Sequence, residues 1–267
     1  MSLGPLAAVL VGWVLMALAM LALWQVQRRR SDASFVDAAW AAGLGLLALL
    51  YAGVLPAGGG RRLLVTLLAA LWSGRLALHL LKDRVIGKEE DGRYREMRRQ
   101  WGARAQAEFF WYFQAQALAA ALFSVPFVVA MANGRPFPGA WDAAGAAVWL
   151  AAVGGEWLAD AQLARFRADP RNRGRTCRAG LWSWSRHPNY FFEWLHWWSY
   201  VLLAAGGPWW WLTLLGPAAM LYLLFRVTGI PKNEARALET RGDDYRDYQR
   251  RTSAFIPLPP RRPRRDG

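Results

Sequence analysis

The sequence is poor in the residues that build disulfides and metal centres. Cys177 is the only cysteine among 267 residues, which excludes an intrachain disulfide framework and a zinc or iron–sulfur site built from several cysteines. The three histidines, His79, His187 and His196, are too few for a histidine-rich metal cluster. Glu193 and His196 have the spacing of half a di-iron site, but the chain has no second Glu-x-x-His, so we expect no bound metal.

Nucleotide-binding loops and acidic residues are also scarce. The chain has no Gly-x-Gly-x-x-Gly after a strand and no Walker loop, which excludes a Rossmann or P-loop nucleotide site. Only 19 acidic residues oppose 33 basic ones, a net charge of +14. Such a charge can indicate nucleic-acid binding. Here the basic residues stand beside apolar runs, which favours a membrane surface, and we expect no nucleic-acid partner.

Apolar residues are abundant instead, at 55% of the chain with 17 Trp. The mean hydropathy of +0.07 averages long apolar stretches with strongly basic ones. About 20 mostly apolar residues are needed to cross the bilayer as a helix. The sequence predicts seven such stretches, which run over Leu3–Val26, Phe35–Leu55, Leu63–Leu81, Phe109–Met131, Trp141–Leu163, Tyr190–Ala205 and Trp209–Thr228.

Positive charge predicts the orientation. With seven spans and a cytoplasmic C-terminus, 28 of the 33 basic residues fall in cytoplasmic segments and only three in outer loops. The cytoplasmic segments are Arg28–Arg30, Lys82–Arg104, Arg165–Arg186 and the tail from Lys232. This asymmetry follows the positive-inside rule. We therefore expect an all-α polytopic membrane protein with seven transmembrane helices, its N-terminus outside and its C-terminus cytoplasmic. We expect one membrane-embedded domain over residues 1–267, with a disordered basic tail at 258–267.

Ionisable residues gather at the cytoplasmic ends of the spans. Asp37 opens the second, Asp160 closes the fifth, and Asn189 and Glu193 open the sixth. A transporter more often has polar breaks near the midplane and related halves. The observed placement favours an enzyme that combines a charged, soluble cofactor with a lipophilic substrate.

The block from Gly180 to Glu193, GLWSWSRHPNYFFE, is the most informative motif. Pro188 suits the first turn of a helix, which places Asn189 and Glu193 on one face. Ser185, Arg186 and His187 precede that helix, where free N–H groups favour an anion such as phosphate. Alternatively, Arg186 and His187 meet lipid headgroups and Asn189 caps the helix. A carboxylate within a span, as at Glu193, is costly and usually functional.

A second stripe lies at the end of the fifth span, where Glu156 and Asp160 are four residues apart and the same face continues to Leu163 and Arg167. Asp160 could accept a hydrogen bond from a ribose or an amide, and Arg167 and Arg175 could hold phosphates. The alternative is an acid–base pair that ties the helix end to the next loop.

The second and third spans offer weaker candidates. Asp37 in a first helical turn is ordinary compensation of the helix dipole, or else a partly buried functional carboxyl group. Arg84, Arg93 and Tyr94 either join a cofactor site or are solvated.

These residues resemble the steroid 5α-reductase family, above all its bacterial branch. The resemblance rests on the Gly180–Glu193 block, the Glu156-x-x-x-Asp160 stripe and the ending DYQRRTSAFIP, and it extends from Asp37 to Pro257. It implies a membrane reductase that uses NADPH to reduce the 4,5 double bond of a 3-oxo-Δ4 steroid.

The resemblance also implies site residues. Cofactor contacts are expected from Asp160, Arg167, Arg175, Asn189 and Glu193, with Glu156 and Leu163 on the same stripe, Arg84 and Arg93 in the basic loop, and Glu234 near the tail. Family members hold the steroid carbonyl with a Gln-Glu pair and a Tyr, whose places Val36-Asp37 and Trp72 take here. We expect a protonated Asp37, or less effectively Trp72, to stabilise the enolate oxygen.

The rival interpretation is an isoprenylcysteine-type membrane methyltransferase, which also carries an Arg-His-Pro-x-Tyr block and uses S-adenosylmethionine. The arginines favour the reductase because S-adenosylmethionine has no phosphate. We expect a steroid or another lipophilic enone as substrate, a monomer, and residence in the bacterial inner membrane with the site open to the cytosol.

Overall fold

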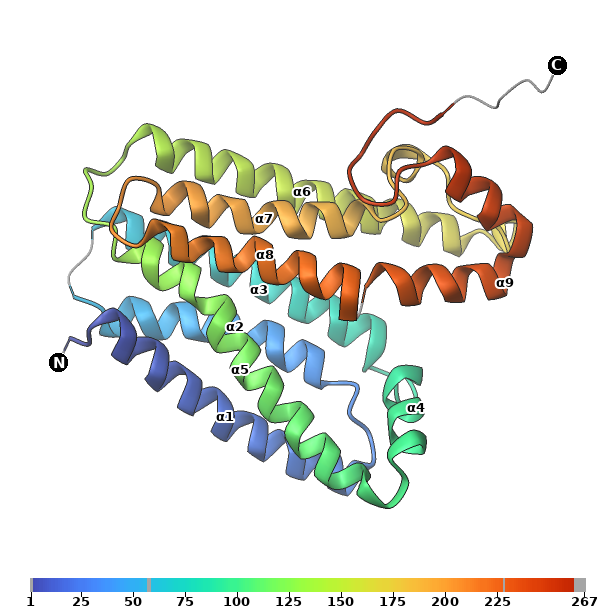
Figure 1. The fold of residues 1–267 in the computed structure, drawn as a ribbon, viewed down its shortest axis with the longest axis horizontal. Coiled ribbons are helices and arrows are strands. Elements are labelled where there is room, and N and C mark those ends of the chain that lie inside the picture. Colours follow the sequence, from blue (N-terminus) through green and yellow to red (C-terminus); the bar gives the residue numbers. More distant parts are fainter. Residues whose placement is uncertain (1, 57–58, 228, 262–267) are drawn as a thin grey trace. The chain divides into compact units, whose positions relative to one another are not determined.

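The computed structural model describes residues 2–56, 59–227 and 229–261, and is all-helical, with no β-strand among these residues (Figure 1). The helices are α1 (Pro5–Arg30), α2 (Val36–Val54), α3 (Gly60–Arg84), α4 (Gly92–Trp101), α5 (Ala105–Met131), α6 (Ala140–Ala168), α7 (Pro188–Ala204), α8 (Leu215–Tyr222) and α9 (Ile230–Arg251). All seven predicted apolar stretches are helical within the described residues. Thr228, the last residue of the seventh, lies outside them.

The helices form two compact units. The first comprises the described parts of Met1–Ala143 and Tyr200–Gly216, and the second those of Ala144–Ser199 and Pro217–Gly267. The expected single domain stays a prediction. Of the tail expected to be disordered, residues 262–267 lie outside the described residues, whereas the N–H groups of Leu258 and Arg261 donate backbone hydrogen bonds.

The first unit is built from α1, α2, α3 and α5. In it α1 packs on α5, and α2 packs on both α3 and α5 (Figure 1). Its largest fully buried side chains include Trp72, Tyr51, Phe109 and Phe127. The hydroxyl of Ser73 on α3 accepts a hydrogen bond from the N–H of Gly45 on α2. Apolar and small residues therefore bring these helices close enough for backbone contact.

A buried ion pair closes one end of this unit. The Arg61 guanidinium donates to both carboxylate oxygens of Asp142, at 2.6 and 2.8 Å, and to the carbonyls of Asn133, Arg135 and Pro136. The first turns of α3 and α6 and the loop between α5 and α6 are thereby held together. Arg61, expected in an outer loop, is instead a buried structural residue.

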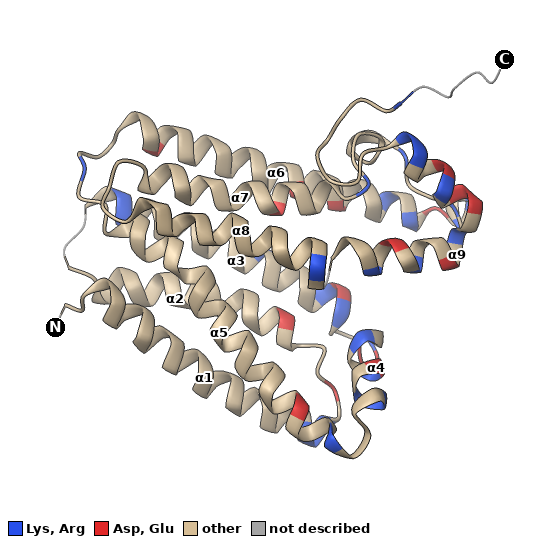
Figure 2. Ribbon diagram, viewed as in Figure 1, with Lys and Arg blue, Asp and Glu red and all other residues tan. Residues whose placement is uncertain are grey.

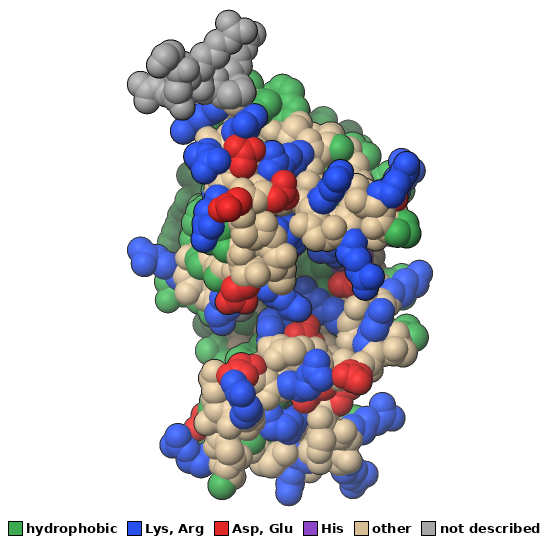
Figure 3. All heavy atoms as spheres, turned by 90° about the vertical axis from the view of Figure 1, so that its right-hand side faces the viewer, with side chains coloured by type: hydrophobic (Ala, Val, Ile, Leu, Met, Phe, Trp, Pro, Cys, Tyr) green, Lys and Arg blue, Asp and Glu red, His purple; other side chains and the backbone are tan. Residues whose placement is uncertain are grey.

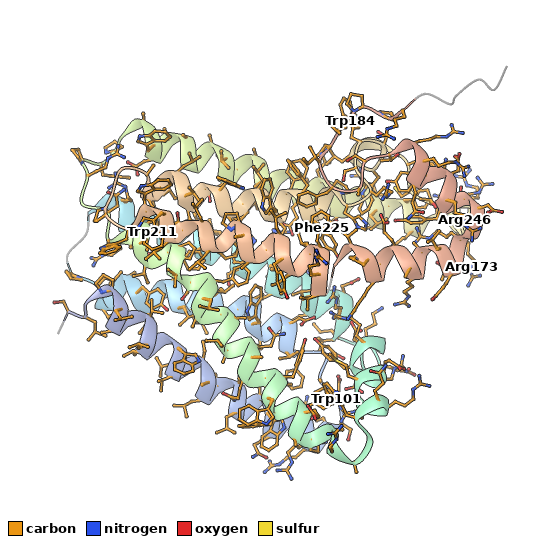
Figure 4. All side chains as sticks on the ribbon, viewed as in Figure 1. Trp101, Arg173, Trp184, Trp211, Phe225 and Arg246 are labelled. Atoms are coloured by element: carbon orange, nitrogen blue, oxygen red, sulfur yellow. The ribbon has the colours of Figure 1, made fainter. Side chains whose placement is uncertain are left out.

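Helix α4 was not among the predicted stretches because it is polar and has only ten residues. Asp91 caps its first turn by accepting a hydrogen bond from the N–H of Arg93. At its other end the Arg98 guanidinium lies 4.7 Å from the centre of the Phe109 ring, and Trp101 meets the same ring edge-on at 4.9 Å (Figure 4). Contact with α5, rather than its own apolar pattern, stabilises this helix.

The second unit contains most of α6 and α7, together with α9. The indole N–H of Trp182 donates to the Ala159 carbonyl, and Gln162 accepts from the N–H of Leu181, so that the loop before α7 lies along α6. A Cβ on Gly155 would stand 2.4–2.6 Å from three ring carbons of Phe192. Helices α6 and α7 can approach this closely only because residue 155 is glycine.

Five helices are long and apolar enough to cross a membrane by length and composition; the fifth is the continuous run Trp210–Arg251. The apolar part of that run ends at Val227, and half of the residues of α9 are charged. The other two predicted spans correspond to α6, which carries Glu156 and Asp160, and to α7, which has only 17 residues. In the first unit, Lys and Arg mark the C-terminal ends of α1 and α3 (Figure 2).

Candidate functional site

The candidate residues form one cluster in the first unit and three groups in the second. In the first unit Asp37, in the first turn of α2, accepts hydrogen bonds from three side chains. Arg84 at the end of α3 donates at 2.9 Å, Arg93 of α4 at 2.7 Å, and the Tyr94 hydroxyl at 2.7 Å. Asp37 is 19% exposed, while Tyr94 is only 1% exposed. We call Asp37, Arg84, Arg93 and Tyr94 the Asp37 cluster.

The loop before α4 holds this cluster in place. The Ser34 hydroxyl accepts a hydrogen bond from the N–H of Asp91, and Glu90 accepts from the N–H of Ala33. Asp91 also binds the guanidinium of Arg93. Burial raises the pKa of Asp91, but the hydrogen bonds from Arg93 outweigh it and keep the pKa below its ordinary value. A carboxylate that stays ionised keeps α4 anchored over the start of α2.

The Asp37 cluster differs from the sequence-based expectation. Asp37 accepts a hydrogen bond from each of two guanidinium groups and from one phenol. Arg84 and Arg93, which were expected to hold phosphates, thus bind a carboxylate in this cluster. Trp72 of α3 is fully buried.

The sequence does not predict that Tyr94 contacts Asp37. Its ring meets Tyr112 of α5 edge-on, the two hydroxyls are 3.5 Å apart, and the amide of Gln116 donates to Tyr112 at 3.1 Å. A phenol thus lies beside the Asp37 carboxylate. Only its contact with Asp37, 57 positions away, could have revealed this role.

In the second unit, α6 and α7 bring the two predicted stripes together. The side-chain amide of Asn189 donates to Asp160 at 3.2 Å, so these two residues meet. Glu156, one turn before Asp160, and Glu193, one turn after Asn189, are 5% and 9% exposed. Asp160, Asn189, Glu156 and Glu193 therefore lie on facing stretches of two packed helices.

Arg186, His187 and Glu234 form a network of their own. Arg186 Nε donates to Glu234 at 2.6 Å, His187 Nε2 lies 3.3 Å from the same oxygen, and the Gln249 amide donates to the other oxygen at 2.9 Å. In α9, outside the apolar segments, burial raises the pKa of Glu234, but hydrogen bonds from His187 and Arg186 lower it to about 2. The anion expected before α7 is thus the Glu234 carboxylate. Glu234 thus ties α9 to the segment before α7.

A pocket of about 440 Å³ lies where α6 ends. Three predicted cofactor residues, Leu163, Arg167 and Arg175, line it, and Arg173 and Arg241 join them. Arg173 is labelled in Figure 4, and Lys and Arg side chains gather on this face of the unit in Figure 3. We call it the arginine pocket.

The arginine pocket differs from the other arginine clusters in its charge balance. Within the described parts of the chain, no carboxylate lies within ion-pair distance of its four arginines. Its one acid, Asp169, is bound by Arg171 at 2.7 Å. The charge of the pocket is thus free to bind an anion.

One protein family matches the chain over most of its length. A family described as "Protein of unknown function (DUF1295)" matches residues 23–252. No curated protein and no solved structure matches the chain. Because the matched range includes every member of the Asp37 cluster and of the arginine pocket, and most of the chain, the chain belongs to the DUF1295 family.

Proposed function

We propose that the chain is a membrane-embedded reductase that uses NADPH to reduce the 4,5 double bond of a 3-oxo-Δ4 steroid or a related lipid enone. The DUF1295 family is associated with steroid 5α-reductase-like proteins. The resemblance of the Gly180–Glu193 block and of the Asp160 stripe supports the same activity. When bound, NADPH would supply the hydride that is added to the β-carbon of the enone.

The observation that carries this proposal is the arginine pocket. Three of the residues expected to touch the cofactor line one cavity, and its arginines have no carboxylate partner in the described chain. Guanidinium groups bind phosphate with paired, charge-assisted hydrogen bonds. The positively charged sulfonium and the carboxylate of S-adenosylmethionine offer no phosphate, so the pocket favours the reductase over the methyltransferase.

The Asp37 cluster would supply the electrostatic part of the reaction. Arg84 and Arg93 already neutralise Asp37, so the Tyr94 proton can turn from Asp37 towards a substrate oxygen without leaving an unpaired buried carboxylate. A hydrogen bond to the developing enolate is the largest electrostatic task in such a step. We therefore assign the donor role to Tyr94 and a positioning role to Asp37.

The membrane topology belongs to the same proposal. The five apolar helices, completed by α6 and α7, would make seven spans with the N-terminus outside and the C-terminus cytoplasmic. The excess of basic residues in the corresponding loops supports this orientation. The cofactor residues of both clusters would then open to the cytosol, in the inner membrane of a bacterium.

The test is NADPH oxidation by the protein purified in detergent, with progesterone or testosterone added. We expect steroid-dependent oxidation and a saturated 5α product. Tyr94→Phe should lower the rate on the order of 10²–10³-fold, as for a lost oxyanion contact. Tyr222→Phe is the matched control, because this tyrosine is 63% exposed on α8.

Three results would contradict parts of the proposal. NADPH binding without turnover would reject the steroid enones as substrates. Full activity of Tyr94→Phe would reject the assigned donor. Binding of S-adenosylmethionine and not of NADPH would reject the reductase in favour of the methyltransferase.

A further inference from the structure

The arginine pocket has an apolar part as well as a charged one. Leu163, Phe166 and Pro170 line it together with the buried Cys177. Its volume of about 440 Å³ lies in the range of small-molecule sites and is much larger than one phosphate group needs. The combination suits a ligand that has a flat, apolar ring and a strongly anionic group close to each other.

Two of the four arginines come from places that the cofactor motifs do not include. Arg173 belongs to the loop that follows α6, and Arg241 belongs to α9, more than 65 positions further along the chain. The guanidinium of Arg241 lies 5.7 Å from the centre of the Tyr245 ring. The C-terminal helix thus forms one wall of the pocket.

Several contacts fix α9 where Arg241 can reach the pocket. Arg178 binds Asp244 and Asp247, each at 2.8 Å, and the N–H of Thr176 donates to Asp244 at 2.8 Å. At Gly242 the helix breaks, with φ 51° and ψ −122°. A left-handed backbone of this kind favours glycine, so the residue after Arg241 sets the bend.

The pocket concentrates its positive charge around one cavity. A pyrophosphate bridge spreads two negative charges over two phosphates, whereas a phosphate monoester carries nearly two on one group near neutral pH. Four arginines that line one cavity and have no carboxylate partner in the described chain suit the concentrated charge of a monoester. The ring-plus-dianion combination is that of an adenosine with a phosphate on its ribose.

We propose that the arginine pocket takes the adenosine 2′-phosphate end of the dinucleotide, and that Arg173 and Arg241 set the preference for NADPH over NADH. The inference rests on the proposed function for the identity of the cofactor. Phe166 and Pro170 would contact the adenine, and the arginines would bind the 2′-phosphate. Helix α9 is therefore part of the cofactor site.

The experiment measures binding directly and needs no turnover. Quenching of tryptophan fluorescence is followed while the full-length protein in detergent is titrated with adenosine 2′,5′-bisphosphate, 5′-AMP or inorganic phosphate. We expect the bisphosphate to bind at least about tenfold more tightly than 5′-AMP, the effect of one charge-assisted hydrogen bond. Arg173→Gln and Arg241→Gln should each reduce that ratio towards one.

Arg236→Gln is the matched control, because Arg236 is exposed on the same helix and does not line the pocket. It should leave the ratio unchanged, which separates a local contact from the charge of α9 as a whole.

The outcomes distinguish the inference from the proposed function. If the wild type binds NADPH, yet binds the bisphosphate no better than 5′-AMP, the inference is wrong and the reductase stands. Equal effects of all three variants, or binding of inorganic phosphate as tight as the bisphosphate, would also overturn it, since the pocket would then be a general anion site. If neither NADPH nor the bisphosphate binds, both proposals fail.

Discussion

Replacing Gly155 by alanine tests the packing that brings the cofactor stripes together. The added Cβ would lie 2.4–2.6 Å from three carbons of the Phe192 ring, whereas carbon atoms in contact are about 3.5–4.0 Å apart. Helices α6 and α7 must therefore separate locally by about 1 Å, or the ring must leave its rotamer. Overpacking of this kind costs roughly 1–3 kcal/mol.

Gly154→Ala is the matched control. A Cβ at Gly154 meets no atom within 4 Å, and the substitution gives the same gain in helix propensity on the same turn of α6. Thermal unfolding in detergent, followed by tryptophan fluorescence, should show Gly155→Ala to be less stable than Gly154→Ala by about 1–3 kcal/mol. Because Asp160 pairs with Asn189 across the same interface, Gly155→Ala should also weaken NADPH binding.

A second substitution tests whether the Phe192 ring causes the loss of stability in Gly155→Ala. In the Gly155→Ala background, Phe192→Leu replaces the ring by a smaller side chain and relieves the clash with the new Cβ. The double variant should therefore recover part of the lost stability. Equal stability of Gly155→Ala and Gly154→Ala would refute the close approach of the two helices. Failure of the double variant to recover would show that the clash is not with this ring.

Three further outcomes follow from particular contacts. Arg61→Met leaves the buried Asp142 carboxylate without its partner and should lower the free energy of unfolding by about 3–5 kcal/mol, whereas adding Asp142→Asn should restore part of it; additive losses in a double-mutant cycle would contradict this. The pKa of Glu234 falls from 4.5 unfolded to about 2 folded, so its contribution to stability is complete above about pH 4.5 and declines as the pH falls towards 2. Glu234→Gln should remove that part of the pH dependence, and an unchanged profile of the melting temperature would count against the network. Gly242→Ala should cost roughly 1–3 kcal/mol and weaken binding of the bisphosphate, because alanine does not readily adopt the left-handed backbone there.

The sequence alone determined the features that depend on local pattern. A run of about 20 apolar residues can bury its backbone hydrogen bonds only as a helix, and all seven predicted stretches are helical in the described chain. Spacing of four residues placed Glu156 and Asp160 on one face of α6, and Asn189 and Glu193 on one face of α7. Polar helices α4 and α9 were missed because neither has a run of about 20 apolar residues; α9 instead buries one face, with Ala237, Tyr245 and Tyr248.

Only the tertiary structure decided which partner each charge takes. Arg84 and Arg93 could have faced phosphates, yet they bind Asp37, which lies 47 and 56 positions away. Arg186 likewise takes the Glu234 carboxylate, while Arg167 and Arg175 keep no carboxylate partner in the described chain. A guanidinium group binds any anion within reach, so its role depends on which anion the packing brings there. Chain spacing does not determine that distance, and the packing of the helices does.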